Sequence, residues 1–535
     1  MTVTKRPHFH DLPPEVVENI AENLDLGSLK CLRLASTACR ILCLGPRFKS
    51  FFRQKTTDLT ESSLEALCAL ASHPDLGPAV KHLTIMAVIY DVSEAERILS
   101  LGVRRIAGKL DEGTVRSAVH ATLAQENNLT FGTLRGFKNS RPMIGFSRQN
   151  CDDQDRLDAE SDLTWLRARQ KEQDGQSDES ILSSLVSAFR TFTRLDSVNL
   201  DAITVWGRRD TTVSTLHGQD WHRIWVRASQ VYRLSMSALA TSGLVVESLA
   251  VYRNTLRCSV PSCDIMAPLE NFDSRNIALL GTSIRNLALG VSMKVETDAG
   301  KISATRKKIL EQTTPGSRRL FDWDMLGSTD PEAVAETNFT GIARLLQFMP
   351  NLEALDLHLY RCLRGDLSGY DQIFELISQH IRLPLLKQCY LRGVYATQGA
   401  LLQFLANHPF INHLDLREIY LTSGAWEPVI DHLNSKMPTL TRLRLSNLWT
   451  TQVLNLRPIW EADFDEMDYL KPSPISYPCQ GGLVVHTWDF KEHDLKKGLE
   501  FYPTVQNPIP LGSPGRLHWL QSCLLEYGPP MGIIP

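Results

Sequence analysis

The chain has 535 residues, of which 43% are hydrophobic and 22% charged, an ordinary composition for a globular protein. Its 57 basic and 60 acidic side chains leave a net charge of −3, which argues against nucleic acid or an anionic membrane surface as the main partner. The length is far above the ~150 residues of a typical domain, so we expect several domains or one elongated array.

The sequence also bears on where the protein works. No window approaches the ~18 uninterrupted apolar residues of a membrane helix. The opening, MTVTKRPHFHD, lacks the apolar segment of a secretory signal. The 11 cysteines are scattered and odd in number, as in a reduced protein whose thiols fill the core. We therefore expect an intracellular protein, cytoplasmic and/or nuclear, with no membrane partner.

The stretch over residues 12–44 predicts three short helices. Pro13 and Pro14 suit a first helical turn, where a missing N–H costs nothing. Ser36 suits the N-cap of a third helix over 37–42. Apolar residues of the first helix recur on one face: Val16, Val17, Ile20, Ala21 and Leu24. About 33 residues cannot bury a sufficient core alone, so the unit must pack on its own chain or on another protein.

This stretch resembles the F-box, whose motif opens with Leu-Pro-x-Glu and an apolar pair and later reads Leu-x-x-Leu-Arg-Leu. The aromatic residue that often opens the third helix of that family is absent, since residues 36–41 read STACRI. The alternative is an ordinary amphipathic helical hairpin. The matching residues are Leu12, Pro13, Glu15, Val16, Val17, Ile20, Leu24, Leu29, Leu32, Arg33 and Leu34.

The resemblance implies docking to the Skp adaptor of a cullin-type ubiquitin ligase. The chain would then be a substrate-recognition subunit that is not an enzyme, or alternatively a repeat scaffold that binds the adaptor outside a ligase. We place the F-box at 8–50 and a helical linker at 51–79. The residues expected to contact the adaptor are Leu12, Pro13, Val16, Ile20, Leu24, Leu29 and Leu32.

A second pattern, apolar-x-x-apolar-x-apolar, recurs along the rest of the chain. Its eight copies start at Val80, Leu195, Val246, Ile284, Leu352, Leu386, Ile411 and Leu440. The last four starts are 34, 25 and 29 residues apart, spacings typical of leucine-rich repeats. A helical pattern precedes each of these four and ends near a proline: Pro350, Pro384, Pro409 and Pro438.

This part resembles the leucine-rich-repeat domains that often follow an F-box. The fold expected is an α/β repeat, with a three-helix F-box, an irregular leucine-rich-repeat solenoid over 80–450, and a C-terminal cap and tail over 451–535. Within the cap, alternation over 483–490 predicts a strand, and helices are expected over 493–501 and 517–527. Insertions are expected at about 92–180 and 294–328. The first should hold a helix over 92–129, capped by Ser93 and Glu96, and an acidic, mobile segment over 151–180 with a helix near 163–169. The acidic segment is either a solvated loop or a dock for a basic partner.

No phosphate-binding loop, nucleophile elbow or zinc-binding motif is evident, so we predict no catalytic residue, metal or cofactor. The expected partners are the Skp adaptor, a cullin complex and an unknown protein target, without nucleic acid. Aromatic and Arg residues beside the strands are candidates for target binding, because such residues commonly anchor interfaces. They are Tyr360, Arg361, Tyr395, Tyr420 and Trp449. The alternative role for them is packing between neighbouring repeats.

Overall fold

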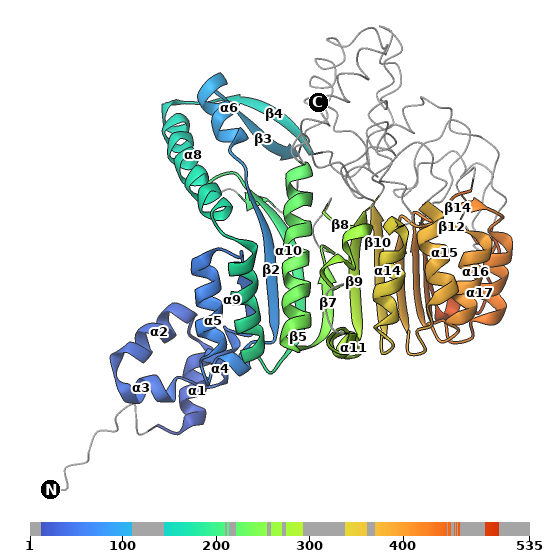
Figure 1. Cartoon of the computed structure of the whole chain (residues 1–535), viewed down its shortest axis with the longest axis horizontal. Helices are drawn as coiled ribbons and strands as arrows, with labels where there is room; N and C mark the ends of the chain where they lie inside the picture. The colour runs from blue at the N-terminus through green and yellow to red at the C-terminus, as the bar shows by residue number, and fades with distance from the viewer. Residues whose placement is uncertain are drawn as a thin grey trace.

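The computed structural model describes residues 12–109, 144–208, 211–212, 221–253, 258–269, 274–292, 337–360, 370–446, 448–450, 454, 456, 458–460 and 487–501. Within them a single large sheet of 12 strands runs through the protein (Figure 1). The strands are β1 (Gln54–Thr57), β2 (His82–Tyr90), β5 (Arg194–Val205), β6 (Thr211–Thr212), β7 (Val245–Val251), β8 (Val260–Pro261), β9 (Asn286–Ser292), β10 (Ala354–Tyr360), β11 (Gln388–Arg392), β13 (His413–Arg417), β15 (Arg442–Ser446) and β16 (Thr487–Lys491).

The sheet is mostly parallel. Its hydrogen-bonded order is β1-β2-β5-β7-β9-β10-β11-β13-β15-β16, with β6 beside β5 and β8 beside β9. Strand β16 runs antiparallel to β15 and β6 antiparallel to β5, while the other pairs are parallel. Because β1 pairs with β2, the sheet already begins in the segment that we expected to be a helical linker.

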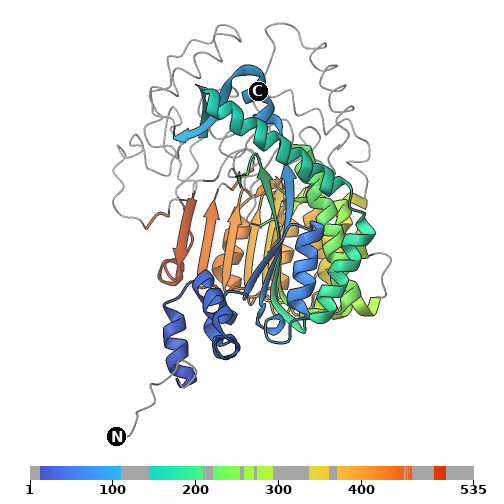
Figure 2. The same ribbon diagram turned by 90° about the vertical axis from the view of Figure 1, so that its left-hand side faces the viewer.

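Helices cover one face of this sheet (Figure 1, Figure 2). Parallel neighbours require crossover connections, and helices provide them. They are α5 (Glu61–Ala71), α9 (Asp178–Thr191), α10 (Trp221–Ser242), α11 (Ser274–Ser283), α14 (Thr337–Gln347), α15 (Tyr370–His380), α16 (Gln398–Asn407) and α17 (Glu427–Lys436). The predicted prolines lie just after α14 to α17, as the sequence indicated.

The middle and last positions of all eight copies of the apolar motif lie on strands and in register with one another. The middle positions align across the sheet: Leu83, Val198, Leu249, Leu287, Leu355, Cys389, Leu414 and Leu443. The last positions align in the same way: Ile85, Leu200, Val251, Leu289, Leu357, Leu391, Leu416 and Leu445. Each of these side chains is at most 2% exposed. At about 1.5–3 kcal/mol for each buried side chain, this ladder contributes substantially to the stability of the core.

The N-terminal unit consists of α1 (Pro14–Glu22), α2 (Leu26–Ala35), α3 (Thr37–Leu42) and α4 (Pro46–Ser50). The first three were predicted and α4 was not. The Ser36 hydroxyl accepts a hydrogen bond from the Cys39 N–H at 3.0 Å, which confirms the N-cap. The unit packs on its own chain through a small core that also includes α5 and the residues after it: Ala21, Leu29, Phe48, Leu70 and Leu76.

The first insertion differs from the helix predicted over 92–129. Helix α6 (Ser93–Leu101) ends at Gly102, whose positive φ of 64° closes the helix, and β3 (Val103–Lys109) follows it. Strand β3 pairs antiparallel with β4 (Ile144–Asn150). The expected capping box is also wrong, because the N-cap is Val92 and the Ser93 N–H donates to Asp91 at 2.9 Å.

The acidic segment over 151–180 is not a mobile loop. It forms the 22-residue helix α8 (Asp153–Asp174), which begins with a capping box between Asp152 and Asp155. The helix expected near 163–169 is confirmed but is much longer than expected, because the whole segment is rich in good helix formers. Leu166 is fully buried, and the Gln170 side-chain amide donates to the Tyr90 carbonyl at 2.6 Å. These contacts fix α8 beyond one end of the strands (Figure 2).

The C-terminal region is described only in part. Strand β16 confirms the strand predicted to end near Phe490, and it lies at the edge of the sheet. Helix α18 (Glu492–Leu495) is shorter than the helix predicted over 493–501. The insertion expected at 294–328 and the helix expected over 517–527 lie outside the described residues.

Candidate functional site

Apolar side chains remain exposed on the three N-terminal helices. They are Val16 (40% exposed), Ile20 (38%), Leu34 (85%) and Ile41 (68%). Within the described part of the chain, these are four of the twelve large apolar side chains that are exposed. Exposed apolar side chains gathered on short helices are typical of a surface that another protein covers. We call these four residues the apolar surface.

The residues predicted to contact the adaptor divide into three groups. Pro13, Val16 and Ile20 are exposed on or beside α1. The side chains of Leu12, Leu24 and Leu32 are half-buried. Leu29 is 0% exposed and belongs to the core of the unit, where it holds the helices together. Helical phase separates Leu34 from Leu29, because five residues correspond to a rotation of about 140°.

Polar contacts fix the geometry of these helices. Asp25 caps α2 by accepting a hydrogen bond from the Ser28 N–H at 2.7 Å, which lowers the pKa of Asp25. Glu18 in α1 accepts a hydrogen bond from the Arg47 backbone at the start of α4. The guanidinium of Arg33 in α2 lies 3.9 Å from the ring centroid of Phe48. The apolar surface is therefore presented on a fixed scaffold.

A second candidate site lies on the face of the sheet opposite the helices. Alternate residues of a strand point to opposite faces, so the residues between the buried Leu positions line this polar face. Those of β10, β11, β13 and β15 include Asp356, His358, Tyr390, Arg392, His413, Asp415, Arg417, Arg442 and Arg444. Among the described residues, no cluster of His, Cys, Asp or Glu is arranged to hold a metal ion.

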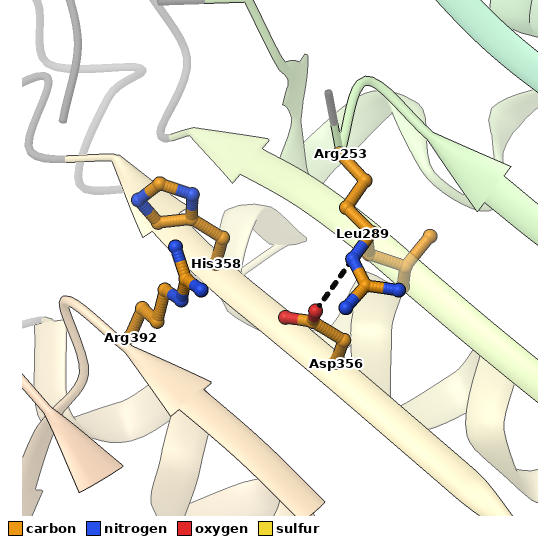
Figure 3. Close-up of a pocket in the computed structure, with 5 residues that line it drawn as sticks. All are labelled: Arg253, Leu289, Asp356, His358 and Arg392. Atoms are coloured by element: carbon orange, nitrogen blue, oxygen red, sulfur yellow. Dashed lines mark ion pairs between the residues drawn. The ribbon is translucent and has the colours of Figure 1, made fainter. Parts of the chain in front are cut away.

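A pocket of about 190 Å³ opens on this polar face. Its lining comes from the segment just after β7 and from β9, β10 and β11: Arg253, Leu289, Asp356, His358 and Arg392 (Figure 3). The Nε of Arg253 lies 2.9 Å from the carboxylate of Asp356. In Figure 3 the guanidinium of Arg392 lies beside the His358 ring, across the Asp356 carboxylate from Arg253.

The pocket is strongly polarised. Burial lowers the pKa of His358 to about 3, and the neighbouring charges of Arg392 and Arg417 act in the same direction, so the imidazole is neutral at pH 7. Burial raises the pKa of Asp356, and this effect is partly offset by Arg253. On the next strand, the Nε of Arg417 donates to Asp415 at 2.7 Å.

The residues predicted to bind a target lie elsewhere. Tyr395 in β12 (Tyr395–Thr397) is 3% exposed, and its ring centroid is 5.4 Å from that of half-buried Tyr420 in β14 (Tyr420–Ser423). Trp449 forms a β-bridge with Tyr420. Such contacts agree with the alternative role of these residues, packing between neighbouring strand–helix repeats. Tyr360 ends β10, and Arg361 lies outside the described residues.

Sequence reasoning did not identify the pocket. Its residues come from strands that are far apart in the sequence, and only the register of the sheet brings them together. One sequence feature could have indicated this polar face: polar or charged residues alternate with leucines in the strands, as in LDLHL over 355–359.

Comparison with known proteins places the N-terminal helices in a family. The model of the F-box domain matches residues 9–51. No curated protein matches the chain. No described helix is long and apolar enough to cross a bilayer. Residues 9–51, with the exposed apolar side chains of α1 to α3, are thus an F-box domain, the domain through which a chain binds the Skp adaptor.

Proposed function

We propose that this chain is the substrate-recognition subunit of a Skp/cullin/F-box ubiquitin ligase. The observation that carries the proposal is the exposed apolar surface of the F-box domain, Val16, Ile20, Leu34 and Ile41. In this role the adaptor contacts that surface together with Leu12, Pro13, Leu24 and Leu32. The chain works in the cytoplasm and/or nucleus, where the adaptor and cullin are present.

The remainder of the chain, in this proposal, is an irregular leucine-rich-repeat domain that holds a protein target. The support is the register of eight motif copies across successive parallel strands, each connection bringing a helix to the same face. The F-box helices lie at the β1 end of the sheet, whereas β10 to β15 lie toward the other end (Figure 1). A target on the polar face would therefore leave the adaptor surface free.

The mechanism proposed is proximity rather than chemistry by this chain. A target held on the polar face is brought near the ubiquitin carried by the partner enzyme, which raises the effective concentration of the reacting groups. Tyr420 and Trp449 remain candidate rim contacts for the target. The chain itself supplies no catalytic group in this scheme.

Reconstitution with purified partners tests the proposal. The full chain is mixed with the Skp adaptor and a cullin, and the complex is analysed by size-exclusion chromatography with light scattering. We expect one complex that contains all three proteins. A complex with the adaptor that excludes the cullin would favour the alternative, a repeat scaffold outside a ligase. Failure to bind the adaptor would contradict both.

A further inference from the structure

The arginines of the polar face are not all neutralised by acidic partners. Three ion pairs lie on this face: Arg253–Asp356, Arg417–Asp415 within β13, and Arg442–Asp489 between β15 and β16. Arg392 and Arg444 have no ion pair among the described residues. The face therefore carries an excess of positive charge, and one of the two unmatched guanidinium groups lines the pocket.

Arg392 is also short of hydrogen-bond acceptors. Its Nε is buried and has no hydrogen-bond partner in the described part of the chain. A buried donor loses its hydrogen bonds to water, and without a protein acceptor this free-energy loss is not compensated. The loss is larger for a charged group. An oxyanion in the pocket would remove that cost, since a guanidinium binds carboxylate or phosphate through two parallel hydrogen bonds.

The pocket has the size and rigidity of a binding site. Its volume of about 190 Å³ far exceeds what a single water molecule needs. Asp356, His358 and Arg392 project from hydrogen-bonded strands in fixed register, with His358 opposite Arg392. Groups on regular strands are held more precisely than groups on loops. Asp356 forms its ion pair with Arg253; the charge of Arg392 also acts on Asp356, but the two form no ion pair among the described residues.

We propose that this pocket binds an oxyanion, a phosphoryl or carboxylate group, with Arg392 as the principal contact. Arg253 borders the anion and keeps the Asp356 carboxylate turned toward itself. That the oxyanion belongs to a protein target rests on the proposed function; binding of the anion itself does not. The pocket then selects targets by an acidic or phosphorylated side chain.

The test measures anion binding by the full chain with simple probes. Thermal unfolding midpoints are recorded against inorganic phosphate or acetate, in the millimolar range, at ionic strength held constant with potassium chloride. We expect a saturable rise in the midpoint for at least one anion. A stronger response to phosphate identifies a phosphoryl site, and a stronger response to acetate identifies a carboxylate site.

Two variants make the test specific. Arg392→Gln should raise the half-saturating concentration about ten-fold or more, because it removes the charge-assisted hydrogen bonds. Arg442→Gln, an arginine on the same face but outside the pocket, should bind the anion as the wild type does. An identical response of Arg392→Gln and wild type, or no saturable response to either anion, would overturn the proposal.

The two proposals fail separately. Arg392→Gln should bind the Skp adaptor with wild-type affinity, because Arg392 is not part of the F-box domain. If the wild-type chain does not bind the adaptor, its thermal response to the anion should still be saturable. A wild-type chain that binds the adaptor but gives no saturable anion response would refute the pocket alone.

Discussion

Replacing Val16 and Ile20 together by aspartate is expected to weaken binding to the Skp adaptor about 100-fold or more. Both side chains are exposed on α1, at 40% and 38%, and neither belongs to the core of the F-box domain. Two carboxylates would be taken out of water at an apolar interface, which costs more than the lost apolar contact alone. The measurement is the dissociation constant of the adaptor by isothermal titration calorimetry.

The matched control for this variant is Leu279→Asp. Leu279 is 56% exposed on the helix α11, outside residues 9–51. The Leu279→Asp variant should bind the adaptor as tightly as the wild type does. Circular dichroism should show that both variants keep their helices. If the Val16 and Ile20 variant binds with wild-type affinity, the adaptor does not dock on the apolar surface.

Gly393→Ala is expected to lower the free energy of unfolding by about 2–4 kcal/mol. Gly393 joins β11 to β12 with a positive φ of 66°. A Cβ at this position would lie 2.1 Å from the carbonyl oxygen of Leu359 on β10. The substitution combines backbone strain with a clash against backbone, which cannot move without disturbing the sheet. Urea denaturation, followed by circular dichroism, measures the loss.

Gly399→Ala is the control, because it makes the same substitution six residues later. Gly399 lies in helix α16, and a Cβ there would have nothing within 4 Å. Alanine in a helix is more favourable than glycine by roughly 0.5–1 kcal/mol, so this variant should be slightly more stable. If both substitutions change the free energy of unfolding equally, the backbone at Gly393 does not lie close to the Leu359 carbonyl of β10.

The sheet could be predicted from sequence because its signal is repeated. Each strand buries alternate residues, and each of the helices α14 to α17 ends near a proline, so copies that are weak one by one support one another. The N-cap at Ser36 could be predicted because capping is local chemistry. The full length of helix α8 could not be predicted, only a helix near 163–169. Leu166, one of its few apolar residues, is buried through contacts with β2 and β5, which are distant in sequence.

The candidate sites were predictable to different degrees. The F-box motif identified the helices but not which leucines stay exposed: Leu29 closes the core, whereas Leu34 faces outward. That distinction depends on how α2 packs against α4 and Leu76, which no local pattern encodes. The pocket depends on strand register over long sequence distances, and so Arg253 and Asp356 could not be paired from sequence.

In the proposed assembly the F-box helices dock the adaptor while the polar face stays open for a target. Hydrogen–deuterium exchange of the full chain, with and without the purified Skp adaptor, distinguishes the two surfaces. We expect new protection confined to α1, α2 and α3, with exchange in β10, β11 and β13 unchanged. Protection over those three strands, or no protection in the N-terminal helices at saturating adaptor, would rule this assembly out.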